Sequence, residues 1–324
     1  MSLRYDALKI LSDGGFHSGT RLGGALGVSR TAVWKHLRAL GELGLDIYAV
    51  PGKGYRLAQP VELLDAHAIT VAMNDTARAL LGGIAIHPRL DSTNTYLMQQ
   101  AAAGLASGYA CLAEYQEAGR GRRGRNWVSP FGANIYLSIL WRFTLDPTQL
   151  GGLSLAVGVA MARALRAAGA DGLGLKWPND VLWQGRKLAG ILLEMSGESF
   201  GASTVVVGLG VNCRMPKEAG AHISQPWTDL EEMLGRRLSR NALAASLLNE
   251  VLPVLRNYQT QGLAPMLDEW QQYDAICGKT VTLQLPNQSI TGVAAGVDRD
   301  GALLLTRDGV TQRHLAGEIS LRVA

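Results

Sequence analysis

Residues 119–125 read GRGRRGR and lie inside the longer stretch 114–127, EYQEAGRGRRGRNW. Glycine costs a helix about 1 kcal/mol relative to alanine, so three glycines in seven residues predict a loop. Its four arginines repel one another, and we expect an anion to order them. The planar guanidinium group pairs well with phosphate or carboxylate, and glycine lets the backbone approach such a ligand closely. The stretch therefore predicts a loop that closes over an anionic small molecule. In isolation, a solvated basic loop or a nucleic-acid patch would be the better explanation, and only the neighbouring motifs reverse this preference.

The chain as a whole has the composition of an ordinary globular protein. Its 324 residues suggest two or three domains, and 47% of them are hydrophobic. The N-terminus lacks the shape of a signal peptide, and the best apolar run, 153–165, is short and contains Arg163. We therefore expect no membrane partner. The three cysteines are widely spaced and odd in number, which predicts a cytoplasmic protein without disulfides or a cysteine metal cluster.

The positive charge of the chain is concentrated at its N-terminus. The net charge is +4, and residues 1–60 hold eight Lys and Arg against four Asp and Glu. The remaining residues are therefore neutral overall. A local basic excess of this kind is typical of a nucleic-acid-binding domain.

Residues 1–60 predict a winged helix-turn-helix domain. A helix over 3–13 ends at Gly14, a second runs from Ser18 to Leu26, and Ser29 begins a third. On the third helix Val33, Leu37 and Leu40 recur with helical spacing and should face inward. Strands at 47–50 and 55–57 flank a basic turn, 51–54, that forms the wing. The residues expected to contact DNA are Ser29, Arg30, Thr31, Lys35, Arg38 and Lys53. The alternative is a three-helix packing module without DNA, and the sequence leaves the placement of Trp34 and His36 open.

After a linker at 59–65, residues 65–270 predict a catalytic domain of alternating strands and helices. Strands are expected at 84–90, 110–115, 135–141, 173–177, 181–183, 188–195 and 204–211, and helices at 94–103, 149–168 and 241–261. The turn at Gly185 joins two neighbouring strands as a hairpin, which favours a mixed sheet over a parallel one. Residues 211–229 have no clear period and are predicted to be a long loop.

Residues 275–324 have a different sequence pattern. Five short alternating strands are expected, at 280–285, 289–297, 302–306, 310–314 and 319–322, with turns at Asp300-Gly301 and Asp308-Gly309. This spacing predicts a small SH3-like barrel. The fold class expected for the whole chain is multidomain α/β (α+β), with the winged helix first and the barrel last.

Three segments besides the arginine loop carry polar residues at the ends of predicted elements. Residues 91–94, DSTN, place hydroxyl and amide groups at a helix start, where free N–H groups also bind anions. Residues 176–180, KWPND, place a lysine and an aspartate around a proline turn. Lys187 begins a buried strand. Taken singly, a helix cap, a surface turn and a solvated hairpin lysine would explain them.

Together these segments match a known pattern. The chain resembles biotin–protein ligases, specifically the bifunctional class that is also the repressor of the biotin operon. The match runs through DSTN (91–94), EYQEAGRGRRGRNW (114–127), SPFGANIY (129–136), KWPNDV (176–181), GRKLAGILLE (185–194) and GLGVN (208–212). Their order, between a helix-turn-helix and a small barrel, covers essentially the whole chain. The poorly patterned segment 211–229 receives no ligand contacts from the resemblance.

The resemblance implies a two-step reaction. Biotin's carboxylate attacks the α-phosphate of ATP, biotinyl-5′-AMP forms, and pyrophosphate leaves. A lysine amine of a biotin carboxyl carrier protein then attacks the acyl-adenylate. Cations and Mg²⁺ are needed to bring two anions together, and no enzyme nucleophile is required.

The resemblance also implies roles for individual residues. The expected catalytic residues are Lys187, Arg122, Asp180 and Lys176, with Asp180 also the candidate Mg²⁺ ligand. The expected biotin-binding residues are Ser92, Thr93, Asn94, Gln116, Arg120, Gly121, Arg122 and Lys187. The expected nucleotide-binding residues are Arg120, Arg122, Arg125, Trp127, Lys176 and Asn212, although Trp127 fits a core position equally well.

The expected partners are the carrier protein, operator DNA, and a second copy of the chain when biotinyl-5′-AMP is bound. Two alternatives stay open at this point. One is a ligand-responsive transcription factor without catalysis, which leaves Lys176, Asp180 and Lys187 unexplained. The other is a lipoate–protein ligase, whose chemistry is parallel.

Overall fold

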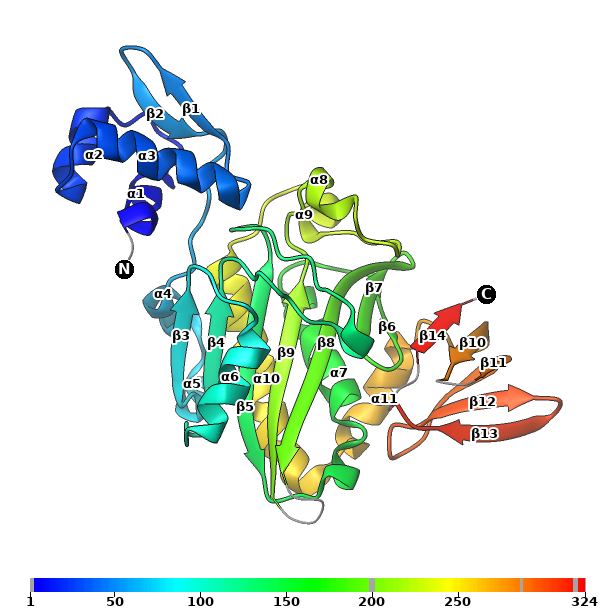
Figure 1. Cartoon of the computed structure of the whole chain (residues 1–324). Coiled ribbons are helices and arrows are strands. Elements are labelled where there is room, and N and C mark those ends of the chain that lie inside the picture. The colour runs from blue at the N-terminus through cyan, green and yellow to red at the C-terminus, as the bar shows by residue number, and fades with distance from the viewer. Residues whose placement is uncertain (1–2, 198–201, 286–287, 317–319, 324) are drawn as a thin grey trace.

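The structure is a computed structural model that describes residues 3–197, 202–285, 288–316 and 320–323. A small N-terminal domain and a C-terminal sheet lie at opposite ends of a larger central domain (Figure 1). The N-terminal domain contains the helices α1 (Leu3–Leu11), α2 (Gly19–Leu26) and α3 (Arg30–Leu40), the short η1 (Gly41–Leu43), and a hairpin of β1 (Ile47–Val50) and β2 (Gly54–Leu57). This is the winged helix-turn-helix that the sequence predicts.

Local sequence explains how this domain turns. The hydroxyls of Ser18 and Ser29 accept hydrogen bonds from the backbone N–H groups of Arg21 and Ala32, which caps α2 and α3. Gly27, at φ +66°, ends α2 in a left-handed conformation that favours glycine. The expected inward residues of α3 are buried in a core shared with α1 and α2.

The central domain is built on a seven-stranded sheet. In sheet order its strands are β3 (Gly83–His87), β4 (Tyr109–Ala113), β5 (Ile135–Phe143), β9 (Ser203–Val211), β8 (Arg186–Gly197), β7 (Asp180–Trp183) and β6 (Leu173–Lys176). The pair β3–β4 is parallel and the other pairs are antiparallel. The predicted mixed sheet is confirmed.

Helices cover the two faces of this sheet unequally. On one face lie α7 (Leu153–Ala167) and α10 (Arg240–Gln261), together with α4 (Ala66–Ala72), α5 (Asp75–Leu80) and α11 (Ala264–Tyr273). The other face carries α6 (Thr93–Ala102), which packs on β5 and β9. The segment Pro147–Ala167, which includes α7, has the length and apolar composition of a membrane span, but it is mostly buried inside the protein. It is the central helix of the main core.

Several predicted elements are wrong in their bounds. The strand expected at 84–90 ends at His87, because Pro88 has no N–H group to continue the ladder. The helix expected at 149–168 is a 3₁₀ turn, η3 (Pro147–Leu150), followed by α7 after a break at two glycines. The loop expected at 211–229 contains a one-turn helix, α8 (Lys217–Gly220), and is followed by α9 (Leu230–Leu234). The helices α4, α5 and α11 were not predicted.

The C-terminal domain is a five-stranded antiparallel sheet. Its order is β13 (Val310–His314), β12 (Leu303–Arg307), β11 (Ser289–Val297), β10 (Thr280–Gln284) and β14 (Ser320–Val323). The predicted last strand, 319–322, begins at Ile319, which lies outside the described residues. The indole N–H of the buried Trp177 donates a hydrogen bond to the carbonyl of Gly301 at 3.1 Å and so ties this domain to the central one.

The three cysteines occupy different environments. Cys111 and Cys213 are buried, and burial raises the pKa of each thiol to about 12. Cys277, between α11 and β10, is exposed. All three thiols are free.

Candidate functional site

A cavity of about 370 Å³ opens on the sheet face that carries α6. Its floor is formed by β5, β9 and β8, where Tyr136 pairs with Gly210, Gly210 with Gly190, and Ser138 with Gly208. The glycines hollow the sheet at this point. A Cβ atom at Gly208 would lie 2.2 Å from Asn94 Oδ1, and one at Gly210 would lie 2.5 Å from Trp127 Cε2. The space therefore depends on glycine at these positions.

One end of the cavity is lined by neutral polar groups. Gln116 Oε1 accepts hydrogen bonds from the backbone N–H of Thr93 at 2.9 Å and from its hydroxyl at 3.2 Å. The hydroxyl of Ser138 lies 2.7 Å from Thr93 Oγ1 and 2.6 Å from Asn94 Oδ1. Ser92 is the N-cap residue of α6 but makes no side-chain cap hydrogen bond. This end offers both donors and acceptors on a rigid frame.

The same polar end is fixed from β8 by Glu194. Its carboxylate accepts a hydrogen bond from Asn94 Nδ2 at 2.9 Å and forms an ion pair with Arg120 at 2.9 Å. Arg120, half-exposed, is thereby held beside the neutral cluster.

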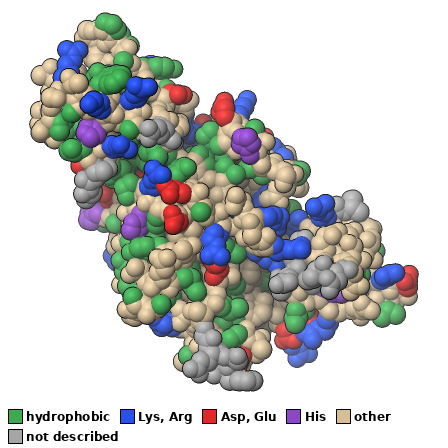
Figure 2. Space-filling model, viewed as in Figure 1, with side chains coloured by type: hydrophobic (Ala, Val, Ile, Leu, Met, Phe, Trp, Pro, Cys, Tyr) green, Lys and Arg blue, Asp and Glu red, His purple; other side chains and the backbone are tan. Residues whose placement is uncertain are grey.

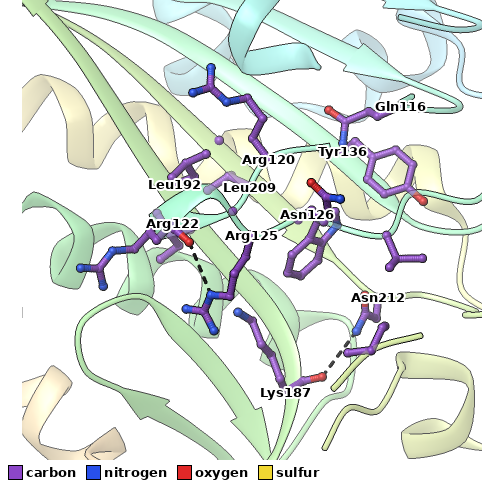
Figure 3. Close-up of a pocket in the computed structure, with 18 of the residues that line it drawn as sticks. Gln116, Arg120, Arg122, Arg125, Asn126, Tyr136, Lys187, Leu192, Leu209 and Asn212 are labelled. Carbon is purple, nitrogen blue, oxygen red and sulfur yellow. Dashed lines mark hydrogen bonds between the residues drawn. The ribbon is translucent and has the colours of Figure 1, made fainter. Parts of the chain in front are cut away.

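The other end of the cavity is cationic. Figure 3 shows Arg125 and Lys187 close together on one side, with Gln116 and Tyr136 on the other. No Asp or Glu is among the described residues that line the cavity. Just outside it, Asp180 Oδ1 lies 2.6 Å from Lys187 Nζ. An anion that enters this end therefore meets positive charge first.

The arginine loop is anchored to two other parts of the chain. Within it lies the short η2 (Arg122–Gly124). Arg122 donates hydrogen bonds to Asn179 Oδ1 at 3.1 Å and to the carbonyl of Ala316, in the C-terminal domain, at 2.6 Å. Burial lowers the pKa of Arg122, while nearby Asp180 acts in the opposite direction. The loop thus joins the cavity to the C-terminal domain.

Trp127 lies inside the cavity and not in the hydrophobic core. Its ring passes over Gly190 and Gly210, and Lys187 Nζ is 5.3 Å from the ring centroid. Its buried indole N–H has no hydrogen-bond partner among the described residues, and the same holds for Oδ1 of Asn212, a second lining residue. Both residues line the cavity, so two buried polar atoms beside it lack a partner in the described part of the chain.

A segment that the sequence left unassigned forms the remaining wall. Residues 222–225 and Trp227 line the cavity. The backbone of this segment pairs with β8, since Lys187 N–H donates to Pro226 O at 2.9 Å and Thr228 N–H donates to Lys187 O at 3.0 Å. The wall and Lys187 are therefore parts of one hydrogen-bonded unit.

The structure brings most of the predicted site residues together. Those that line the cavity are Ser92, Thr93, Asn94, Gln116, Arg120, Gly121, Arg122, Arg125, Trp127, Lys187 and Asn212. Lys176 and Asp180 are not in the lining. They face each other in the β6–β7 hairpin, behind Lys187. Burial lowers the pKa of Lys176, and Asp180 partly offsets this effect.

Sequence reasoning missed several residues of the site. Ser138 is the one small polar side chain in the β5 stretch IYLSILW, and that isolation is a signal that was available. Gly190, Gly208 and Gly210 lie in the matched motifs, but their part in making the cavity depends on register. Glu194 ends the motif GRKLAGILLE and was given no role.

A buried ion pair joins the residue that follows β4 to the start of α10. Glu114, fully buried, is 2.7 Å from Arg240 Nη2, and its other oxygen accepts from the backbone N–H of Leu64 at 2.6 Å. The interdomain linker continues to Gln59, whose side-chain oxygen accepts from Arg214 at 2.6 Å. The linker is thus attached both to the end of β4 and to the segment that follows β9.

The outer face of α3 carries the predicted DNA-binding residues. Four of them lie on α3 and are exposed: Arg30, Thr31, Lys35 and Arg38. Ser29, just before the helix, and Lys53, in the wing, are exposed as well. Figure 2 shows Lys and Arg side chains interspersed with hydrophobic ones on this domain. Ser29 also caps α3.

Comparisons with known proteins agree with this architecture. Three family models match: "HTH domain" over residues 4–56, "Biotin/lipoate A/B protein ligase family" over 86–212, and "Biotin protein ligase C terminal domain" over 276–322. The bifunctional ligase/repressor BirA of Escherichia coli is 45% identical over 317 residues, which cover 98% of this chain and 96% of that protein. Its Bacillus subtilis counterpart is 31% identical, with 97% and 98% covered.

A solved structure of a biotin protein ligase has a similar fold over most of this chain. The biotin protein ligase of Aquifex aeolicus in complex with biotin and ATP has a TM-score of 0.64 and 28% identity, over 75% of this chain and 99% of that one. The relatives from Escherichia coli and Bacillus subtilis match almost the whole chain, and the HTH model matches its N-terminal domain. The chain therefore belongs to the biotin protein ligase family and, within it, to the bifunctional ligase/repressors.

Proposed function

We propose that the cavity binds biotin and ATP side by side and joins them as biotinyl-5′-AMP, from which biotin passes to a carrier-protein lysine. The observation that carries this proposal is the division of one cavity into a neutral hydrogen-bonding end and a cationic end without carboxylates in its described lining. A ureido ring needs both donors and acceptors, and a carboxylate meeting a triphosphate needs positive charge.

Biotin's ureido ring is assigned to the neutral end. Ser92, Thr93, Asn94 and Gln116 supply its hydrogen bonds, with Ser138 fixing Thr93 and Asn94. The ring enters over Gly208 and Gly210, and the valeryl chain leads its carboxylate toward Lys187. Rigid placement of this kind lowers the entropy cost of bringing two reactants together.

The cationic end stabilises the charge of the chemical step. A carboxylate oxygen of biotin attacks the α-phosphorus, and the bond to pyrophosphate breaks. Lys187 lies where it can neutralise the reacting oxygens, while Arg122 and Arg125 hold the phosphates. Trp127 and Asn212, with their unpaired polar atoms, are assigned to the nucleotide. Arg120 and Gly121 border both ligands. Lys176 adds positive charge from behind the cavity wall.

Mg²⁺ fits this arrangement as an ion carried mainly by the phosphates of ATP. The described residues contain no cluster of three or more metal-ligating side chains, and Asp180 is the carboxylate beside Lys187. Mg²⁺ is commonly bound by one or two carboxylates together with substrate phosphates. When bound, it would neutralise phosphate charge, with Asp180 as its protein ligand.

In the second step a lysine amine of a biotin carboxyl carrier protein attacks the acyl carbon. An amide forms and AMP leaves. Asp180, the carboxylate paired with Lys187, accepts the amine's proton once the ligand's phosphate has taken over Lys187. Closure of the arginine loop and the 222–227 wall protects the acyl-adenylate from water.

The test is biotin-dependent exchange of labelled pyrophosphate into ATP, followed by transfer of labelled biotin to apo carrier protein. Exchange that depends on lipoate instead of biotin would favour a lipoate ligase. Absence of exchange with either acid, by folded protein, would contradict the enzymatic proposal and favour a transcription factor without catalysis.

We also propose that residues 1–60 bind operator DNA, residues 65–270 form the catalytic domain, and residues 275–324 form its C-terminal companion in a cytoplasmic protein. Specific repression usually requires two half-sites read by a dimer. Ligand that orders the arginine loop removes an entropy cost of association, so biotinyl-5′-AMP is expected to promote a homodimer.

Sedimentation and operator titration, without ligand and with biotin and ATP, test this regulatory half. Removal of residues 1–60 should abolish DNA binding while much of the ligase chemistry remains. If neither self-association nor operator affinity rises with ligand, the regulatory proposal is wrong even when the ligase stands.

A further inference from the structure

The exposed face of α3 has an aromatic residue at its centre. Trp34 is 48% exposed, although tryptophan is usually well buried in folded proteins. Val33, Leu37 and Leu40 occupy the buried side of the same helix, so the indole points away from the domain's core. The helix thus places a large apolar group on the surface expected to meet DNA.

The helix that carries Trp34 has only cationic or neutral side chains. The helix RTAVWKHLRAL contains no Asp or Glu, and Thr31, Lys35 and Arg38 are exposed around Trp34. A second copy of this face packed against the first would bring like charges together, which is unfavourable. A polyanion fits both the charge and the helix, because the second helix of a helix-turn-helix enters the major groove.

The indole is held in place by its neighbour one turn along. The guanidinium carbon of Arg38 lies 5.5 Å from the Trp34 ring centroid, within the range of a cation–π contact. This contact restricts both side chains before DNA binds, so less conformational freedom is lost on binding. Trp34 is therefore presented on the helix face as a fixed apolar surface beside a hydrogen-bond donor.

The major groove offers a single apolar feature on its base edges, the 5-methyl group of thymine. We infer that Trp34 is a specificity-determining residue that reads a thymine in each half-site by covering this methyl group. The inference rests on the proposed DNA binding and adds to it a named base contact. Arg38, stacked on the ring, donates to the neighbouring base or phosphate.

The experiment begins with the full-length protein, biotin, ATP and Mg²⁺, and a random duplex pool from which bound DNA is selected. Each thymine of the selected sequence is then replaced singly by 2′-deoxyuridine, which lacks only the methyl group. For the wild type, one position in each half-site should lose about fourfold in affinity, as expected for burial of one methyl group worth about 0.8 kcal/mol. Replacement in both half-sites should cost about fifteenfold.

The variants identify which side chain is responsible. Trp34→Ala should bind the selected DNA more weakly and should show no loss at the uracil position that matters to the wild type. Trp34→Phe should retain part of that loss. Lys53→Ala, on the wing, is the matched control: it should lower affinity and the salt dependence of binding but keep the full uracil effect. Thermal unfolding midpoints verify that each variant is folded.

Three outcomes are distinct. A uracil effect that disappears in Trp34→Ala and persists in Lys53→Ala supports the inference. A selected sequence whose uracil effects are unchanged in Trp34→Ala, or a wild type with none, overturns the thymine contact and leaves DNA binding intact. A folded protein that enriches no sequence overturns the inference together with the DNA-binding proposal.

Discussion

Replacing Lys187 with methionine removes a charge from the cavity and leaves an unbranched side chain that is one atom shorter. Lys187 Nζ lies 2.6 Å from Asp180 Oδ1 and 5.3 Å from the centre of the Trp127 ring. A unit charge about 4 Å from another contributes roughly 4 kcal/mol at an effective dielectric constant near 20. Groups that stabilise charge in a transition state contribute about 2.7–4 kcal/mol when removed singly, or about 10²–10³ in rate.

The expected loss lies at the upper end of that range. Lys187→Met also leaves Asp180 without its ion-pair partner, so a carboxylate then faces the incoming anions. We expect adenylate formation to fall about 10³-fold, measured as biotin-dependent exchange of labelled pyrophosphate into ATP. Adding Asp180→Asn should recover part of the loss, because it removes the stranded charge.

Lys176→Met is the matched control. Lys176 is near the same aspartate but does not line the cavity, so its removal should cost less than about tenfold. A rate for Lys187→Met within about fivefold of the wild type, or a larger defect in Lys176→Met, would exclude Lys187 as the group that neutralises the reacting oxygens.

Three further predictions concern the loop, the buried ion pair and pH. Arg122→Gly should release labelled biotinyl-5′-AMP about tenfold faster in a filter-retention assay, since the hydrogen bonds to Asn179 and Ala316 are lost; unchanged retention would make the loop a static patch. Arg240→Ala should lower the urea-derived free energy of unfolding by about 3–5 kcal/mol, because Glu114 stays buried without its cation; a loss below about 1 kcal/mol would mean that water reaches the carboxylate. Burial lowers the pKa of Lys176 from its ordinary 10.5, so the unfolded chain binds more protons between the two pKa values and stability should rise with pH across that window. Lys176→Met should remove this rise, and identical stability–pH curves for the two proteins would contradict it.

The sequence predicted the order of domains, and it singled out many of the residues that line the cavity, because those features depend on local pattern. Ser29 and Gly27 mark the helix-turn-helix through capping chemistry. The strands around Gly185 are marked by alternating apolar residues and by a turn residue. The arginine loop was recognisable from composition alone. Each of these signals lies within about ten residues of chain.

What the sequence could not supply depends on contacts between distant segments. The ion pair of Glu114 and Arg240 joins residues 126 positions apart, and nothing local to either predicts it. The cavity floor arises from the register of three strands, which aligns Gly190, Gly208 and Gly210. Asp180 was expected in the site itself, and only the fold of its hairpin places it behind Lys187. The helices α4 and α5, of seven and six residues, are too short for a clear helical period.

The unequal environments of the three cysteines allow site-specific labelling of the natural chain. At neutral pH a maleimide reacts with thiolates that it can reach, and Cys111 and Cys213 offer neither access nor ionisation. A dye would therefore attach at Cys277, between α11 and β10. Because Arg122 contacts the C-terminal domain at Ala316, the fluorescence of that dye can report movement of the domain as the arginine loop exchanges protein contacts for ligand. Ligand-driven closure then becomes observable in single molecules that carry no substitution at all.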